Sequence, residues 1–136
     1  MDDCIFCKIV AGEVPAYKVY ENGDYLAFLD IKPLAEGHVL VIPKLHYRWV
    51  WDDPEVGQYM ETCRKVARAQ QRAFSTEWVV SLIFGEEVPH AHIWLVPCTA
   101  GDGHGGSIDL SKRRELPTDK MEEVRDRIIS HLEDKN

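Results

Sequence analysis

Short stretches of alternating polar and hydrophobic residues recur along this chain. Each one predicts a β-strand, because successive side chains of a strand point to opposite faces. Two of them flank the turn-forming segment Asn22-Gly23-Asp24, which predicts a hairpin. The predicted strands span residues 17–21, 25–29, 38–43, 78–84 and 88–97. Strands that follow one another in this way pair most simply antiparallel.

A second period, close to 3.6 residues, predicts two helices. The longer helix spans residues 54–74 and begins after Asp52-Asp53, with Pro54 in its first turn. Its hydrophobic positions are Val56, Tyr59, Met60, Cys63, Val66, Ala67 and Phe74. The C-terminal helix spans about residues 117–132 and packs through Met121, Val124, Ile128, Ile129 and Leu132. The predicted fold class is therefore α+β, an antiparallel sheet of about five strands with two main helices.

The stretch at residues 88–97 is the most informative, because it contains two histidines between two prolines. Residues two apart on a strand share a face and lie about 6.6 Å apart. We therefore expect His90, His92 and Trp94 on one face. The opposite face, directed to the core, is expected to hold Ala91, Ile93 and Leu95. Half-exposed histidines at this spacing also occur without any function, so the spacing alone does not identify a site.

Composition restricts the classes of function. The 136 residues suit one domain, and 45% of them are hydrophobic, which is enough for a core. The formal net charge of −7 argues against nucleic-acid binding through phosphate neutralisation, although not against a small nucleotide. There is no basic N-terminal region followed by a long apolar run, and no apolar stretch approaches about 18 residues. We therefore expect a cytoplasmic protein that binds neither nucleic acid nor membranes.

The four cysteines are Cys4, Cys7, Cys63 and Cys98. Without an export signal they are expected to be reduced thiols or metal ligands, and Cys63 is expected in the core. The Cys4-x-x-Cys7 spacing fits a metal knuckle over residues 4–9 or a redox pair. A redox pair usually follows a strand at the start of a helix, and only three residues precede Cys4, so zinc is favoured. Two further ligands must then come from elsewhere.

Two loop residues have more than one interpretation. Asp30 follows the predicted hairpin and either caps its own backbone or accepts hydrogen bonds from ribose hydroxyls. His104 lies in a glycine-rich loop over residues 98–106, where a solvated histidine is expected more than a phosphate ligand.

Several separated motifs together resemble the histidine triad superfamily of nucleotidyl hydrolases and transferases. They follow the family's order from Cys4-x-x-Cys7 through KVYE (18–21), AFLDIKP (27–33) and GHVLVIPK (37–44) to VPHAH (88–92). The resemblance implies an antiparallel sheet of about five strands with two helices. It also implies a homodimer built around the long helix and a strand, for which Trp49-Val50-Trp51 is a candidate contact.

The resemblance implies that His92 is the nucleophile, since it matches the middle histidine of the family's H-x-H-x-H pattern. Such a histidine attacks the α-phosphorus of a nucleotide ester, anhydride or phosphoramidate and passes the nucleotide to water or another acceptor. This chemistry needs a neutral imidazole near pH 7. The partner of the other ring nitrogen is commonly a backbone carbonyl in this family.

The remaining site residues follow from the same resemblance. In zinc-bearing relatives the first histidine of the triad, here His90, joins two cysteines and a further histidine, here Cys4, Cys7 and His46. Four such ligands leave no open position, so the zinc would be structural. The purine nucleotide pocket is expected to comprise Phe6, Ile9, Phe28, Leu29, Asp30, Ile31, His38, Glu86 and Val88. The resemblance implies that in this pocket Asp30 binds the ribose and His38 lies near the phosphates.

Two residues depart from the family pattern. Trp94 replaces the third histidine, and its indole N–H donates but does not titrate near neutrality. We therefore expect slower hydrolysis and a bias towards leaving groups that need little protonation. Glu86 stands where relatives often have glutamine, and a carboxylate repels phosphate. It is expected either to point away, to favour a less charged substrate, or to act as an acid if burial raises its pKa.

Three functions are compatible with the sequence. The leading one is an enzyme, a zinc-stabilised nucleotidyl hydrolase or transferase acting through His92, with Trp94 beside it. The second is a module that binds a purine nucleotide with little or no turnover, because Trp94 replaces the titrating histidine. The third is a zinc-stabilised scaffold that binds no nucleotide. The intact H-x-H favours the enzyme.

Overall fold

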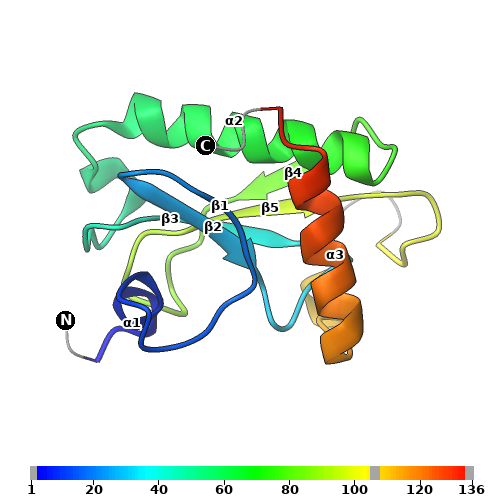
Figure 1. Cartoon of the computed structure of the whole chain (residues 1–136), viewed down its shortest axis with the longest axis horizontal. Coiled ribbons are helices and arrows are strands. Elements are labelled where there is room, and N and C mark those ends of the chain that lie inside the picture. Colours follow the sequence, from blue (N-terminus) through cyan, green and yellow to red (C-terminus); the bar gives the residue numbers. More distant parts are fainter. Residues whose placement is uncertain (1–2, 105–107, 134–136) are drawn as a thin grey trace.

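A computed structural model describes residues 3–104 and 108–133 of the chain (Figure 1). Three α-helices and five strands make up the regular structure of these residues. In chain order they are α1 (Ile5–Val10), β1 (Lys18–Glu21), β2 (Tyr25–Leu29), β3 (Val39–Pro43), α2 (Val56–Ala73), β4 (Val79–Leu82), β5 (Ile93–Pro97) and α3 (Thr118–Ser130). Two short 3-10 helices lie at Val50–Asp52 and Leu110–Lys112. The fold class is α+β, as predicted, and no described helix is long and apolar enough to span a membrane.

The five strands form one antiparallel sheet in the order β1-β2-β3-β5-β4. The predicted hairpin is confirmed as β1 and β2, and both predicted helices are confirmed to within about two residues at each end. Sequential pairing holds from β1 to β3 and again between β4 and β5, but not between β3 and β4. Strand β5 inserts between β3 and β4, which leaves β4 at the edge of the sheet.

The two faces of the sheet are covered by different helices. Helices α2 and α3 cover one face, and α1 lies at the other (Figure 1). The helix-covered face holds the larger core, in which Tyr59 of α2 stacks on Tyr25 and donates a hydrogen bond to the Val41 carbonyl. Cys63 is buried in this core, as predicted, whereas Met60 of the predicted stripe is exposed. A second cluster, which includes Phe6, Phe28, Leu40 and Trp94, lies on the α1 face.

The predicted strand over residues 88–97 is wrong in its first half, because β5 begins at Ile93. Pro89 has no N–H to donate, and the Ala91 amide donates to the carbonyl of Tyr47 instead of to a strand. The predicted faces still hold, since Ala91, Ile93 and Leu95 lie in the α2-side core while His90 and His92 contact Phe6. Residues 5–10 form helix α1, with Cys4 as its N-cap. The two cysteines of the predicted knuckle therefore lie at the N-terminal turn of a helix.

Gln70 connects α2 to the turn before β3 and to β5. Its side chain is fully buried, and its amide nitrogen donates to the carbonyls of Gly37 and Leu95. Gly37 has a φ of +88°, and a Cβ there would lie 2.4 Å from the Phe74 ring, so the turn before β3 requires glycine. These bonds hold the start of β3 and the middle of β5, the strand that follows His92.

Replacement of Gln70 by methionine is expected to lower the free energy of unfolding by about 1 to 3 kcal/mol, because two buried carbonyls lose their donor. The matched control is Gln58→Met on the same helix, where the side chain is exposed and a change within about 0.5 kcal/mol is expected. Urea denaturation of the two variants measures both values. Equal stabilities for the two variants would contradict this role of Gln70.

Candidate functional site

Four metal-ligating side chains from three parts of the chain meet beside α1. They are Cys4, Cys7, His46 and His90, the four residues predicted as zinc ligands, and their ligand atoms all lie within 4.8 Å of one another. The Cys7 sulfur is 3.2 Å from Nδ1 of His46, and the Cys4 sulfur is 3.4 Å from Nδ1 of His90. Helix α1 produces the first half of the cluster, because the Cys4 sulfur accepts the Cys7 amide at the N-cap.

The chemistry of this cluster fits a zinc ion. Nε2 of His90 lies 2.9 Å from the Pro43 carbonyl and donates a hydrogen bond to it. This bond places the ring proton on Nε2 and leaves the Nδ1 lone pair directed at the cysteines. Burial lowers the pKa of His90 and keeps it neutral, the form that binds metals. Burial and the adjacent Cys4 thiol raise the pKa of Cys7 to about 11, so a cation is needed to hold the Cys7 sulfur as a thiolate near neutral pH. Two sulfurs and two nitrogens complete a tetrahedral site with no position left for water.

His92 is held by the backbone of its neighbour His90. Its Nδ1 lies 2.7 Å from the His90 carbonyl, which can only accept, so the proton is on Nδ1. The Nε2 lone pair is therefore free, which is the tautomer that a nucleophile needs. The ring is 2% exposed and stands edge-on to Phe6 of α1, with 5.3 Å between ring centres.

Trp94 lies on β5, two residues after His92, and is 4% exposed. Its ring centre is 5.0 Å from that of His38 and 5.4 Å from that of Phe84. The guanidinium carbon of Arg113 lies 5.1 Å from the same ring. The large indole therefore occupies the space between β3 and the loop before the histidines.

A cavity of about 630 Å³ opens between α1, β2 and the residues that precede His90. Its wall is mainly apolar, as a site for a purine base requires. Seven of the nine residues predicted for the nucleotide pocket line it, namely Phe6, Ile9, Phe28, Leu29, Asp30, Ile31 and Val88. The other two, His38 and Glu86, do not.

Asp30 is the buried carboxylate of this cavity. The predicted cap of its own backbone is confirmed, since Oδ1 accepts the Lys32 amide at 2.8 Å, and the residue also lines the cavity. Burial raises its pKa, and hydrogen bonds from the Lys32 amide and Arg113 oppose that rise. A carboxylate of this kind suits the ribose hydroxyls of a nucleotide.

His38 is completely buried beneath this carboxylate and supplies a neutral N–H group. Its Nδ1 accepts the Leu34 amide at 3.0 Å, so Nε2 holds the proton. Nε2 has no hydrogen-bond partner among the described residues and lies 3.6 Å from Asp30 Oδ2. Burial, followed by the charge of Arg113, lowers the pKa of His38 to about 3. His38 is therefore not a cation for a phosphate group near neutral pH.

A second cavity, of about 260 Å³, lies on the other side of Arg113 and is lined in part by His92. It is lined by Phe84, Glu86, Glu87, His92, Trp94, Leu110 and Arg113. Glu86 is exposed at its rim and does not touch the larger cavity. Glu86 therefore points away from the larger cavity, and its exposure removes the burial on which the expected acid role depended. The expectation of a less charged substrate stays a prediction.

Two features of the loop and segment after β5 differ from the sequence prediction. His104 is buried, with Nε2 bonded to the Leu34 carbonyl and Nδ1 accepting the Asp109 amide, so the predicted solvated side chain is wrong. The predicted loop reaches residues 105 and 106, which lie outside the described part of the chain. The sequence prediction also missed Arg113, which bonds to Asp30 and Glu87. The basic run Lys112-Arg113-Arg114 in an acidic chain was the available signal.

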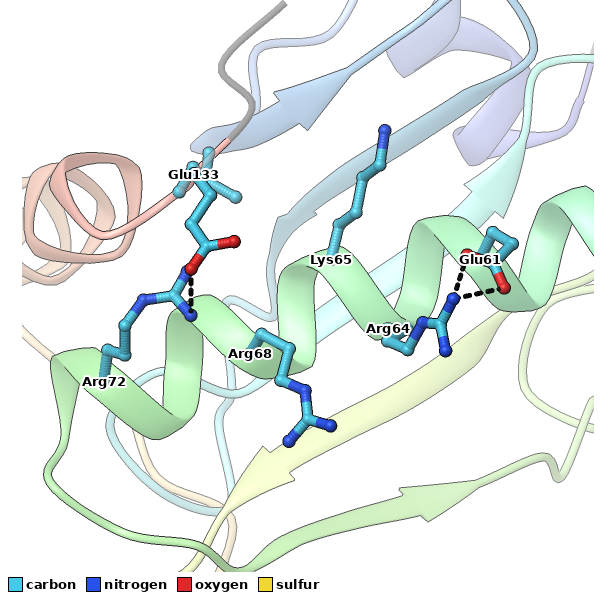
Figure 2. Close-up of a pocket in the computed structure, with 7 residues that line it drawn as sticks. Glu61, Arg64, Lys65, Arg68, Arg72 and Glu133 are labelled. Atoms are coloured by element: carbon cyan, nitrogen blue, oxygen red, sulfur yellow. Dashed lines mark hydrogen bonds and ion pairs between the residues drawn. The ribbon is translucent and has the colours of Figure 1, made fainter.

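A basic hollow lies on the outer side of α2, away from the His92 cavity (Figure 2). Arg64, Lys65, Arg68 and Arg72 line it together with Glu61 and Glu133. Arg64 pairs with Glu61 and Arg72 with Glu133, as the dashed lines in Figure 2 mark. These carboxylates offset much of the positive charge, and no cysteine or histidine is among the described residues that line the hollow.

Known proteins are similar over most of the chain. The HIT domain family model matches residues 11–100. An uncharacterised HIT-like protein of Borreliella burgdorferi is 38% identical over 91% of this chain and 94% of that protein. An adenosine 5'-monophosphoramidase of Saccharomyces cerevisiae is 33% identical, over 96% of this chain and 83% of that protein. An adenylylsulfatase of Arabidopsis thaliana is 35% identical, over 88% of this chain and 64% of that protein.

Solved structures give the same fold. A Hit-like protein of Bartonella henselae, described as involved in cell-cycle regulation, superposes with a TM-score of 0.83 and 32% identity. The match covers 97% of this chain and 98% of that protein. A histidine triad family protein of Mycobacterium smegmatis, described as zinc-bound, has a TM-score of 0.81 and 31% identity, with coverage of 96% and 94%.

The depressed pKa of His38 has a measurable consequence for stability. The unfolded chain binds a proton at His38 below about pH 6.5, whereas the folded chain does so only near pH 3. Proton binding at His38 thus leaves the free energy of unfolding unaffected above about pH 6.5. As the pH falls below this value, it lowers the free energy of unfolding by up to about 1.4 kcal/mol per pH unit. We expect the His38→Asn variant to lose less unfolding free energy than the wild type between pH 6.5 and 4.5, measured by urea denaturation. Identical losses in the two proteins would contradict a neutral buried His38.

Proposed function

The chain belongs to the histidine triad (HIT) family, and from this premise we propose that it is a nucleotidyl hydrolase or transferase that acts through His92. The single observation that best supports the proposal is the 2.7 Å contact from His92 Nδ1 to the His90 carbonyl. This contact leaves a lone pair on Nε2 of a residue that lines a cavity beside the nucleotide pocket. A neutral imidazole in this tautomer can attack a phosphorus atom near pH 7.

The substrate class follows from the larger cavity and from the relatives. The apolar wall suits a purine base, and Asp30 suits the ribose hydroxyls that adjoin it. The relatives from yeast and Arabidopsis have names that denote action on adenosine monophosphate joined to an amine or to sulfate. We infer a purine nucleotide whose α-phosphate bears a second group, as a phosphoramidate or an anhydride.

The proposed reaction has two displacement steps. In the first, the Nε2 lone pair of His92 forms a bond to the α-phosphorus, and the bond to the leaving group breaks with its electron pair on that group. In the second, water or another acceptor attacks the phosphorus, the phosphorus–nitrogen bond returns its electron pair to Nε2, and the acceptor's proton passes to solvent. Dividing one displacement into two lowers each barrier. The His90 carbonyl stabilises the Nδ1–H throughout.

Trp94 limits which leaving groups can depart. Its indole cannot transfer a proton near neutral pH, and its ring is packed among His38, Phe84 and Arg113. We infer that leaving groups stable as anions are favoured over amines, which need a proton. The same residue supports the second candidate function, a module that binds the nucleotide with little or no turnover.

We also propose that a structural zinc occupies the Cys4, Cys7, His46 and His90 cluster. The zinc-bound relative from Mycobacterium smegmatis supports this identity of the metal. Bound there, the metal would tie α1 and the segment after β3 to His90. Since the His90 carbonyl accepts the Nδ1–H of His92, the cluster orients the nucleophile through one intervening residue.

Three expectations from the sequence remain predictions. They are the homodimer, a cytoplasmic location and the lack of nucleic-acid binding. The exposed indoles of Trp49 and Trp51, which are 44% and 70% accessible, are compatible with a subunit contact.

The first test replaces His92 with asparagine, which removes the Nε2 nucleophile. We expect release of adenosine monophosphate from an adenosine phosphoramidate and from an adenosine mixed anhydride to fall at least about a thousandfold. His131→Asn, on a histidine outside the site, is the control and keeps the wild-type rate. Wild-type turnover by the His92 variant would exclude the covalent mechanism. Nucleotide binding without turnover by any of the three proteins would favour the binding module.

A second test measures the metal. Cys7→Ser is expected to lose bound zinc, whereas Cys98→Ala removes a buried thiol outside the cluster and keeps about one zinc per chain. A chelator should lower the melting temperature of the wild type and of Cys98→Ala but not that of Cys7→Ser. Equal zinc content in the two variants, by elemental analysis, would exclude this ligand set.

A further inference from the structure

Arg113 stands at the boundary between the two cavities. It lines the large nucleotide cavity and also the smaller cavity that contains His92 and Trp94. In the described part of the chain it is the only lysine or arginine that lines the smaller cavity. A phosphate bound between the ribose carboxylate Asp30 and His92 would therefore lie near this guanidinium.

The segment that contains Arg113 is fixed to the loop that follows β2. The Arg114 amide donates to the Pro33 carbonyl, and His104 joins the Leu34 carbonyl to the Asp109 amide. The Arg113 side chain itself donates from Nε to the Lys32 carbonyl at 2.9 Å. These bonds set the position of the guanidinium before any nucleotide arrives.

The other two nitrogens of the guanidinium bind carboxylates. One donates to both oxygens of Asp30 at 2.9 and 3.0 Å, and the other donates to Glu87 at 3.0 Å. Glu87 is largely exposed, with 62% of its side chain accessible, so its pairing is weak and readily exchanged. Asp30, in contrast, is buried, and its Oδ1 also accepts a hydrogen bond from the Lys32 amide.

The balance of charge requires this cation. Asp30, Glu86 and Glu87 place three carboxylates around the path from the ribose position to His92, and all three repel a phosphate. The nearby His38 is neutral near pH 7. Without Arg113 no described side chain of the His92 cavity would offset this negative charge.

We propose that Arg113 is the phosphate-binding residue of the site, a role that rests on the proposed nucleotidyl-transfer function. When the ribose hydroxyls donate to Asp30, they replace the bond from Arg113. The freed guanidinium then donates to oxygens of the α-phosphate or of an anionic leaving group. Because arginine stays protonated, it stabilises charge and transfers no proton, so it favours nucleotides with an oxyanion leaving group over those with an amine.

The test compares the affinities of adenosine and adenosine monophosphate by calorimetry, with guanosine and its monophosphate in parallel. The ratio of the two affinities isolates the contribution of the phosphate. We expect Arg113→Gln to lower this ratio about tenfold or more, and Arg113→Lys to lower it less. Arg114→Gln is the matched control, since Arg114 is exposed and lines a hollow on the far side of the loop.

Glu87→Gln provides a readout that a merely structural ion pair would not give. Removing this carboxylate frees the guanidinium and is expected to raise the affinity ratio severalfold, opposite in sign to Arg113→Gln. If Glu87→Gln lowers the ratio as well, or if Arg113→Gln weakens nucleoside and nucleotide equally, the phosphate-binding role is overturned while nucleotide binding stands. If the wild type binds none of the four ligands, the proposed function fails, and the role of Arg113 fails with it.

Discussion

The site depends on the way in which one residue, His90, is held. Its side chain has no freedom, because Nε2 bonds to the Pro43 carbonyl and Nδ1 points at two cysteines and His46. Its carbonyl accepts the Nδ1 proton of His92 at 2.7 Å. A hydrogen bond that His92 donates to a fixed backbone carbonyl selects the tautomer of His92 and the direction of its lone pair. The orientation of His92, the proposed nucleophile, therefore depends on the metal-ligand cluster that holds His90.

The fold separates stability from chemistry by using the two faces of one sheet. On one face, α2 and α3 bury a continuous hydrophobic core. On the other, the short helix α1 leaves a cavity lined by the buried carboxylate of Asp30, and the buried His38 lies 3.6 Å from that carboxylate. Burying a carboxylate and an unpaired N–H is costly unless a partner satisfies them. Nucleotide hydroxyl and phosphate groups have the chemistry to do so.

Much of the fold and of the site could be predicted from the sequence, because both depend on local patterns. Alternation and 3.6-residue periodicity gave the hairpin and the helices, and the spacing of Cys4 and Cys7 identified half of the metal cluster. Errors arose where backbone bonds are made over long sequence distances. The Tyr47 carbonyl accepts the Ala91 amide, so β5 begins later than predicted. Contacts with the loop before β3 bury His104. Arg113 was missed because a local pattern cannot show that it reaches Asp30, 83 positions away.

We propose that His92 carries the nucleotide during turnover. This step is tested most directly by mixing the wild-type, zinc-quantified protein with an excess of an adenosine mixed anhydride and quenching in alkaline denaturant within the first turnover. Intact-mass measurement and peptide mapping then follow. We expect a mass gain of one adenylyl group located on His92. Release of the nucleotide at the full rate, with unmodified His92 at every quench time, would contradict it.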